Sequence, residues 1–370
     1  MRIEVFRNGR IMENKLSTYV FEEFTRFGGG QTVFEHIYRS LLNRGYSAKV
    51  ITDSVHRYLP SYIPDEAFIE TSLLEPKWDN PTLLFPKIIR LKKELEKIVP
   101  SGITINNHPN VFIYNADVNF MHEFFGFMAH KPSSLDKAKL RLIKATGIFN
   151  VYRGGYFLVQ GSFSRRQALE TFASLGIQNT KIDTVDLPVM LPETVDLSLK
   201  SDKVLTFGRI SPDKQLEKAF KLAASFPEID FIVAGRVNPE DSNYLKQLLK
   251  IAPGNLKLIP NPTNEQKDSL FRMCKVYFHT KENENYGISV AEAISYGCFP
   301  VVPLKGGAYE DVLKNGEYGL GYKNLEEAKQ LILQALDVSL GELSRIYASR
   351  DRFTFKRFEA SFIDKIRALF

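Results

Sequence analysis

The stretch that decides the fold is residues 204–225, VLTFGRISPDKQLEKAFKLAAS. Val204 to Phe207 is a short apolar run, which predicts a buried strand. Leu216 to Ser225 has the spacing of an amphipathic helix, and the mainly polar segment 208–214 connects the two. Strand, loop and helix in this order form the repeating unit of an α/β chain with a parallel sheet.

The same alternation continues on both sides of this stretch. Toward the C-terminus it predicts strands at 231–234, 256–259, 275–279 and 299–303, and helices at 244–251, 264–273 and 287–296. Toward the N-terminus it predicts strands at 3–6, 48–52, 103–106, 119–120 and 157–160, and helices at 32–43 and 84–98. Residues 186–203 show no clear period and are interpreted as a linker. Two successive Rossmann-like units follow from this pattern.

Length and composition agree with a two-domain globular protein. At roughly 150 residues per domain, 370 residues correspond to two domains. The chain is 44% hydrophobic and 25% charged, which excludes general disorder. No stretch approaches the roughly 20 uncharged apolar residues of a membrane span. Residues 1–7 carry charges where a signal peptide has its apolar core, so a cytoplasmic location is expected. The two cysteines have no metal-ligand spacing and are expected to be packing thiols.

The loop after the strand at 204–207 carries the first candidate site. In an open α/β sheet, ligands bind beyond the carboxyl ends of the strands, and this loop lies at such an end. Arg209 and Lys214 are five residues apart on it. A guanidinium fork and an ammonium point charge suit a diphosphate. The alternative is a pair of solvated surface cations.

Two carboxylates, Glu284 and Glu292, are separated by seven residues that include Asn285, Tyr286 and Gly287. If the helix starts near Gly287, Glu284 lies on the loop before it and can face a ligand beside the helix N-terminus. Backbone N–H groups at that N-terminus would meet phosphate oxygens. Carboxylates are natural acceptors for sugar and ribose hydroxyls. Further along, Gly306-Gly307 opens a loop on the same edge, where small residues let backbone amides approach a ligand.

Together, these three motifs resemble the retaining glycosyltransferases of the GT-B fold, family 4 (glycosyltransferase group 1). The resemblance is specific over about residues 200–325 and weaker before 190. It implies an α/β fold with two Rossmann-like domains whose parallel sheets face a cleft. An acceptor-side domain is expected over 1–190, completed by a C-terminal helix at 352–370 that crosses back. The nucleotide-sugar-binding domain is expected over 191–351.

The resemblance also assigns roles at the donor site. It implies that Arg209 and Lys214 hold the diphosphate, Glu284 contacts the donor sugar, and Glu292 binds the ribose hydroxyls. The other residues expected around the donor are Gly208, Asn285, Tyr286, Gly287, Ile288, Gly306 and Gly307. Family members commonly have Gly after the motif lysine, where this chain has Gln215. The family uses a nucleotide-diphosphate sugar, UDP- or GDP-linked, as co-substrate, so no other cofactor and no metal is expected.

The N-terminal half offers two weaker candidates. Gly29 and Gly30 belong to a triple-glycine loop before the first long helix, and similar loops in the family border the donor diphosphate; the alternative is a flexible turn. His122 follows a strand-like run and resembles the family histidine that approaches the donor sugar as a catalytic residue. The alternative for a lone histidine among aromatics is a hydrogen-bonded core residue.

The net charge of +6 is concentrated in one window. Residues 131–166 contain eight Lys and Arg against a single Asp. Lys137, Arg141 and Lys144 share one stripe of a helix with an apolar stripe beside it, as in helices that lie on anionic membranes or meet an acceptor there. The alternative is the solvated face of a core helix. Nucleic acid is not expected, because no aromatic-interleaved motif accompanies the charge.

The sequence therefore predicts a glycosyltransferase that moves a hexose-like sugar to an acceptor hydroxyl with retention of configuration. A glycan, a lipid-linked or a protein acceptor all remain open, and basic-helix binding would place the enzyme at the cytoplasmic face of a membrane. The alternatives are a nucleotide-sugar epimerase or an inverting transferase on the same fold, and a non-catalytic basic scaffold that binds membranes or nucleic acid. A nicotinamide-dependent reductase is disfavoured, because the dinucleotide fingerprint is absent.

Overall fold

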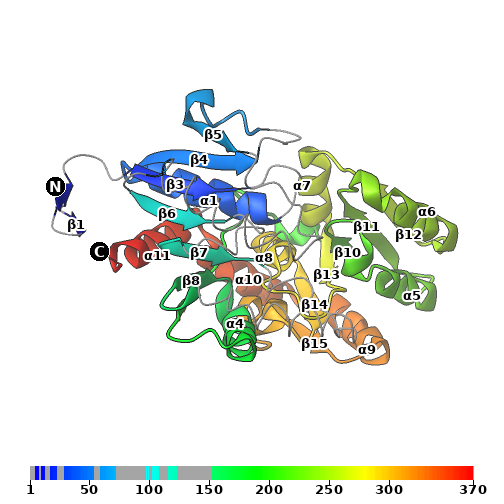
Figure 1. Ribbon diagram of the computed structural model, residues 1–370. Helices are drawn as coiled ribbons and strands as arrows, with labels where there is room; N and C mark the ends of the chain where they lie inside the picture. Colours follow the sequence, from blue (N-terminus) through cyan, green and yellow to red (C-terminus); the bar gives the residue numbers. More distant parts are fainter. Residues whose placement is uncertain are drawn as a thin grey trace. The chain divides into compact units, whose positions relative to one another are not determined.

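The structure is a computed structural model that describes residues 5–7, 10–12, 17–22, 29–53, 59–71, 97, 99, 102–107, 116–122 and 152–369. The chain divides into two units (Figure 1). Unit 1 comprises Met1–Gln160, Ser164–Val185 and Phe358–Phe370, and unit 2 comprises Gly161–Phe163 and Asp186–Arg357. The main division of these units falls at residue 185 and the return to unit 1 at residue 358; the bounds that the resemblance implies are 190 and 352.

Seven of the described strands of unit 1 form a parallel sheet in the order β5-β4-β3-β6-β7-β8-β9. The strands are β3 (Ser17–Phe21), β4 (Ser47–Asp53), β5 (Phe68–Thr71), β6 (Ile103–Asn106), β7 (Val118–Met121), β8 (Tyr156–Val159) and β9 (Lys181–Thr184). Counted from the first strand of the sheet, the order is 3-2-1-4-5-6-7. The direction of winding therefore reverses between β3 and β6.

The start of the chain differs from the expectation. The predicted strand at 3–6 overlaps β1 (Val5–Arg7), but β1 pairs antiparallel with β2 (Arg10–Met12) in a separate two-stranded sheet instead of joining the parallel sheet. The parallel sheet begins with β3, which has the sequence STYVF. Its buried Thr18 faces the same interior as the apolar Val20, so the strand lacks the continuous apolar run that marks its neighbours. Of the predicted helix at 84–98, only residue 97 is described.

Three helices complete the described part of unit 1: α1 (Gly29–Asn43), α4 (Gly161–Leu175) and α11 (Phe355–Arg367). α1 buries Val33, Ile37 and Leu41 at helical spacing. α11 buries Phe358, Phe362 and Ile366, and its Glu359 pairs with Arg44 at 2.7 Å. α11 therefore contributes core residues and an ion pair to unit 1.

The first turn of α4 belongs to unit 2. The backbone N–H groups of Ser162 and Phe163 donate to the carboxylate of Asp311, at 2.7 and 3.1 Å. Gly161 has a φ of +81°, and a Cβ there would lie 2.4 Å from Cγ of Asp311. A buried carboxylate therefore satisfies the free N–H groups at this helix N-terminus.

Unit 2 contains a six-stranded parallel sheet in the order β12-β11-β10-β13-β14-β15. The strands are β10 (Ser201–Phe207), β11 (Asp230–Gly235), β12 (Leu256–Pro260), β13 (Cys274–Phe278), β14 (Phe299–Pro303) and β15 (Leu320–Tyr322). This is the 3-2-1-4-5-6 order of the Rossmann fold, with its switch point between β10 and β13. The predicted α/β class with two parallel sheets is confirmed.

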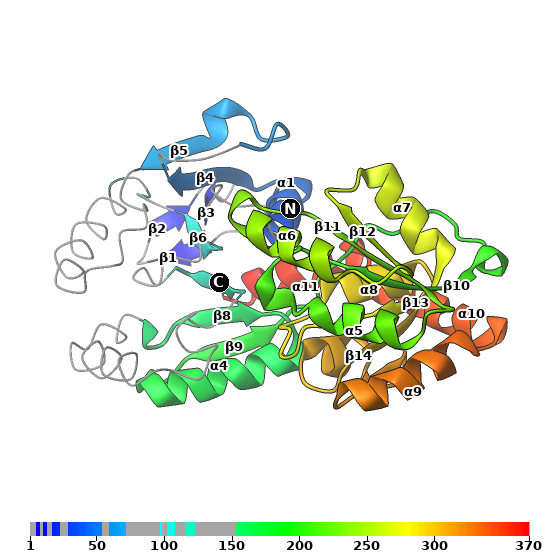
Figure 2. The ribbon, with the colours of Figure 1, turned by 90° about the vertical axis from the view of Figure 1, so that its right-hand side faces the viewer.

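Helices cover both faces of this sheet: Figure 1 shows α7 and α8 on one side and α5, α6 and α9 on the other, and Figure 2 gives a second view. Their bounds are α5 (Glu217–Ser225), α6 (Ser242–Ile251), α7 (Asn264–Met273), α8 (Ile288–Ser295), α9 (Leu325–Leu336) and α10 (Leu340–Ala348). Within the described part of the chain, none of the helices has the length and apolar character needed to cross a bilayer. Ligands of such sheets bind outside the carboxyl ends of the strands at the switch point.

Candidate functional site

The Gly208–Lys214 loop leaves β10 at the switch point of unit 2. Gly208 N–H donates to the Ala234 carbonyl at 3.1 Å, and Gly235 sits so close that a Cβ on it would lie 1.5 Å from the Gly208 oxygen. Gln215, which stands where the family commonly has Gly, adopts a left-handed conformation with φ +54°. That conformation explains the glycine preference, since it costs a residue with a side chain roughly 1 kcal/mol.

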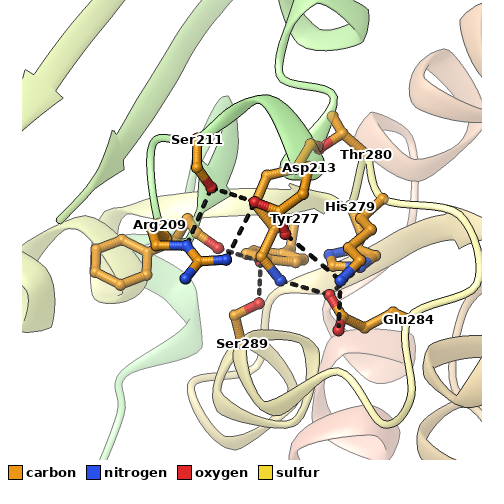
Figure 3. Close-up of polar contacts among 11 residues, drawn as sticks. Arg209, Ser211, Asp213, Tyr277, His279, Thr280, Glu284 and Ser289 are labelled. Atoms are coloured by element: carbon orange, nitrogen blue, oxygen red, sulfur yellow. Dashed lines mark hydrogen bonds and ion pairs between the residues drawn. The ribbon is translucent and has the colours of Figure 1, made fainter. Parts of the chain in front are cut away.

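Arg209 is held within its own loop (Figure 3). Its Nε donates to Ser211 Oγ at 3.1 Å and its Nη2 to Asp213 Oδ1 at 3.1 Å. The Ser211 hydroxyl donates to the same Asp213 oxygen at 2.5 Å. Burial acts to raise the pKa of Asp213, but the Ser211 hydrogen bond and the neighbouring cations outweigh it and lower that pKa. Asp213 is therefore ionised at neutral pH and occupies the guanidinium.

Glu284, on the loop after β13, is surrounded by cations. Lys214 Nζ donates to its Oε2 at 2.7 Å, and Lys281 Nζ lies 3.6 Å from its Oε1. The Glu284 side chain is 15% exposed. Burial acts to raise the pKa of Glu284, but the ammonium groups of Lys214 and Lys281 hold it well below its usual value. We call Arg209, Asp213, Lys214, Lys281 and Glu284 the charge cluster.

His279 lies beside the charge cluster, directly after β13. Its Nε2 is 3.7 Å from Glu284 Oε2, and burial lowers its pKa to about 4, so the ring is neutral at pH 7. Among the described residues, Nε2 has no hydrogen-bond partner. His279 lines a small pocket together with Gly208, Lys214 and Ser289. The pocket therefore contains a buried imidazole nitrogen that is able to contact a ligand.

The Gly306-Gly307 loop packs against the Glu284 loop. Gly306 has a φ of +131° and forms a parallel bridge with Glu284, whose carbonyl accepts from Gly307 N–H at 2.7 Å. A Cβ on Gly307 would lie 2.1 Å from the Asn285 carbonyl oxygen. The glycines therefore permit close backbone packing, and the Gly307 amide is used inside the protein instead of facing outward as the resemblance implies.

The N-terminus of α8 follows the Glu284 loop. Gly287 precedes Ile288 with a φ of +99°, and a Cβ on it would lie 3.0 Å from the Ala308 Cβ. The Tyr286 side chain is 2% exposed and packs in the core, which leaves only its backbone for a ligand. Glu292, one turn into α8, accepts from Lys267 Nζ at 2.5 Å. Lys267 on α7 is thus a further cation of the site, outside the motifs found in the sequence.

Unit 1 has its own polar cluster at the carboxyl ends of its strands. Glu22, Asn107, His122 and Gln160 directly follow the strands β3, β6, β7 and β8, respectively. Gln160 Nε2 is 2.6 Å from His122 Nδ1, and His122 Nε2 is 2.8 Å from Asn107 Oδ1. Asn107 Nδ2 donates to Glu22 Oε2 and, at 3.3 Å, to the Gly30 carbonyl of α1. We call these four residues the polar network.

The polar network determines the state of His122. Burial lowers its pKa to about 4, so the ring is neutral. The amide of Gln160 donates to Nδ1, which leaves the proton on Nε2, where it is donated to Asn107. Both ring nitrogens are therefore engaged within the protein. Of the network, only His122 belongs to a motif; the other three could have been found as polar residues that immediately follow buried strands.

The remaining expected residues are the two glycines of the triple-glycine loop and the three cations of the predicted basic helix. Gly29 begins α1 and Gly30 lies next to His122, with 3.8 Å between a Cβ built on it and His122 Cδ2. Lys137, Arg141 and Lys144, with most of the basic window, lie outside the described residues. Within the described ranges, no group of three or more His, Cys, Asp or Glu side chains is arranged to hold a metal ion.

Solved structures with a similar fold cover nearly the whole chain. WaaG, a glycosyltransferase involved in lipopolysaccharide biosynthesis, has a TM-score of 0.69 at 16% identity over 95% of this chain and 99% of its own. Sucrose-phosphate synthase from Thermosynechococcus elongatus has a TM-score of 0.71 at 13% identity, over 96% and 99%. HepE from Anabaena, in complex with UDP and glucose, has a TM-score of 0.67 at 14% identity, over 95% and 99%. The chain has the GT-B fold of these glycosyltransferases.

The sequence also matches a known family over part of its length. Residues 192–350, most of unit 2, match the model of the glycosyl transferases group 1 family. A curated relative, the GDP-Man:Man(3)GlcNAc(2)-PP-Dol alpha-1,2-mannosyltransferase of Dictyostelium discoideum, is 28% identical over 112 residues. That alignment covers 29% of this chain and 22% of the relative.

Proposed function

We propose that the protein is a glycosyltransferase that moves a hexose-like sugar from a nucleotide-diphosphate sugar to an acceptor hydroxyl, with retention of configuration and without a metal. One observation carries the proposal: three cations, a largely buried carboxylate and Ser289 in the first turn of α8 lie together at the switch point of the sheet, in a segment that matches the group 1 family. This is where a parallel α/β sheet binds a ligand, and its charges suit a diphosphate.

The chemistry follows from how the charges change. Breaking the anomeric bond gives the sugar oxocarbenium character and adds negative charge to the leaving diphosphate. Arg209 and Lys214, both fixed on the loop after β10, would stabilise that charge through preorganised contacts. Glu284 is ionised and would accept a sugar hydroxyl, while Glu292 would accept from the ribose. The acceptor hydroxyl oxygen forms the new bond to the anomeric carbon, and its proton passes to an oxygen of the leaving diphosphate on the same face. Transfer then requires no protein acid or base.

The carboxylates that already pair with the cations would compete with the diphosphate of a donor. In the structure, Arg209 is paired with Asp213 and Lys214 with Glu284. A diphosphate would compete with both carboxylates for these cations. Donor binding should therefore be strongly dependent on charge and should weaken as salt screens the approach.

The test is a thermal-shift panel of UDP, GDP, UDP-glucose, UDP-GlcNAc and GDP-mannose. A bound donor at 100 times its Kd should stabilise the protein by roughly 2.7 kcal/mol, and Lys214→Met should remove the effect. Lys218→Met is the control, because Lys218 is similarly buried but pairs with Glu282 at 2.7 Å. The absence of a shift with every nucleotide would overturn the proposal.

The anomeric configuration of the product, followed by NMR from the start of the reaction, tests retention. An inverted product indicates an inverting transferase, and a changed sugar still linked to the nucleotide indicates an epimerase. Nucleotide binding without turnover, unchanged in Glu284→Ala, favours a non-catalytic scaffold. Transfer that is insensitive to EDTA supports metal independence, and activity that returns only with a divalent cation contradicts it.

The acceptor is proposed to be a glycan, a lipid-linked or a protein acceptor. The Dictyostelium relative is named for a GDP-Man donor and a PP-Dol-linked acceptor, so GDP-mannose with a lipid diphosphate oligosaccharide is the first pair to assay. Contact with an anionic membrane through Lys137, Arg141 and Lys144 stays a proposal. Co-sedimentation with anionic vesicles should fall when all three become Glu, and unchanged binding would contradict it.

A further inference from the structure

Lys281 bridges the two halves of the charge cluster. Its Nζ lies 3.6 Å from Asp213 Oδ2 and 3.6 Å from Glu284 Oε1. The opposite oxygen of each carboxylate contacts a different cation: Oδ1 of Asp213 contacts Arg209, and Oε2 of Glu284 contacts Lys214. Each carboxylate is therefore shared between one cation of the sequence motif and Lys281.

This arrangement matters once an anionic ligand arrives. If Arg209 and Lys214 turn to phosphate oxygens, Asp213 and Glu284 each lose their closest cation. Glu284 is then a largely buried carboxylate, and an uncompensated charge in such a place is strongly unfavourable. Without another partner, the carboxylates would hold the cations back and weaken binding of the ligand.

We propose that Lys281 is a positioning residue that retains both carboxylates of the charge cluster while the other two cations turn to the phosphates of a nucleoside diphosphate. The inference rests on the proposed function, because it needs a ligand that draws cations away. His279 assists at Glu284: its Nε2 is already 3.7 Å from Oε2, so a shift of under 1 Å makes a hydrogen bond.

The distances place Lys281 between the two carboxylates. Its Nζ lies 3.6 Å from each of them, so it forms an ion pair with both. With three cations, two carboxylates and a neutral His279, the cluster has a net charge of +1. Removing Lys281 brings this to zero and leaves the remaining cations fully paired.

The experiment is a double-mutant cycle read by calorimetric binding of inorganic pyrophosphate and of UDP and GDP. Lys281→Met is made in the wild type and in an Asp213→Asn/Glu284→Gln background, in which there is no carboxylate to retain. We expect Lys281→Met to weaken binding about tenfold in the wild type and less than twofold in that background, as for residues that act through each other. Lys281→Arg should restore most of the wild-type affinity.

Lys218→Met is the matched control, since its side chain is 20% exposed against 19% for Lys281 and it contacts neither Asp213 nor Glu284. It should change affinity less than twofold, and equal melting temperatures of the variants establish that each is folded. Equal losses for Lys281→Met in both backgrounds would show direct phosphate contact and overturn the inference, as would no loss in the wild type. Should Lys281→Met not fold, Lys281→Gln enters the same cycle.

The two proposals fail differently. Nucleoside diphosphate binding with the expected coupling, but without transfer of any sugar, supports the role of Lys281 and contradicts the transferase. Sugar transfer with no coupling between Lys281 and the carboxylates overturns only the role of Lys281. Wild-type protein that binds neither pyrophosphate nor nucleotide overturns both.

Discussion

The two units place different chemistry at the same position of the same kind of sheet. In unit 2, the loops beyond β10 and β13 carry the charge cluster, in which each carboxylate is shared between two cations. In unit 1, the residues directly after β3, β6, β7 and β8 form the polar network, a linear set of hydrogen bonds through a neutral histidine. One edge is built of exchangeable ion pairs and the other of fixed, directional contacts.

The difference indicates a division of labour. Ion pairs among several cations can be redistributed when an anion arrives, which suits a diphosphate. Hydrogen bonds among buried amides and an imidazole specify one arrangement and resist change. We therefore expect substitutions in the charge cluster to act mainly on ligand binding and rate, and substitutions in the polar network to act mainly on stability.

The largest effect is expected for Lys214→Met. Losing one preorganised cation at the developing phosphate charge should lower kcat on the order of 10²–10³-fold, by analogy with a lost oxyanion-hole donor. Initial rates with the donor found in the binding panel measure it, with Lys218→Met as the control. A loss below threefold would mean that Lys214 does not face the leaving group.

Gly307→Ala and Gly30→Ala compare the glycines of the two edges. A Cβ on Gly307 would lie 2.1 Å from the Asn285 oxygen, whereas on Gly30 its nearest neighbour is His122 at 3.8 Å. Gly307→Ala should therefore cost about 3 kcal/mol of stability, and Gly30→Ala should stay within about 1 kcal/mol of wild type. Urea unfolding measures both, and similar costs at the two positions would contradict the difference in packing.

Asn107→Leu removes the centre of the polar network. It leaves the Glu22 carboxylate and the His122 N–H without this partner, which should cost about 2 kcal/mol. Asn43→Leu is the control, because Asn43 is exposed and donates to Glu359 at 2.8 Å on the surface. Urea unfolding should show less than 0.5 kcal/mol for the control. Equal costs would show that burial of the network contributes nothing.

The smallest effect per residue concerns pH. Burial lowers the pKa of both His122 and His279 to about 4, below the ordinary 6.5, so the unfolded chain binds their protons first. Stability should therefore fall as pH decreases from about 6.5 toward 4, by on the order of 1–2 kcal/mol per imidazole at pH 5. NMR should show no titration of the His122 and His279 rings in the folded protein between pH 7.5 and 5.5. A midpoint near 6.5 would contradict the burial of that ring.

Below about pH 4, the stabilities of the two units should depend differently on pH. The pKa values of Glu284 and Asp213 are lowered, so their pairs stabilise the fold above the ordinary carboxyl pKa and are lost only as pH falls further. Unit 2 has these charged pairs at its strand edge. A transition specific to unit 2 below about pH 4 would identify their contribution.

The sequence predicts unit 2 well, because its decisive residues are glycines and charges at short, fixed spacings. Arg209 and Lys214 are set by one loop, and Gly287 by the start of one helix. Lys281 and His279 could not be assigned, since their role depends on the loops of β10 and β13 becoming neighbours at the switch point. Three of the four residues in the polar network were missed for the same reason, since they come from the ends of different strands. The strand β3 was missed because Thr18 interrupts its apolar pattern.

The chain passes from unit 1 to unit 2 at Gly161 and back at Ser164, and it returns to unit 1 for the last time at Phe358. During synthesis on a ribosome, the N-terminal strands would therefore emerge long before α11, which supplies Phe358, Phe362 and Ile366 to their unit. Unit 2 can complete its sheet first, although it starts later. Unit 1 thus begins to be made before unit 2 but receives α11 only after it, and until then the apolar surface that α11 covers needs protection from aggregation.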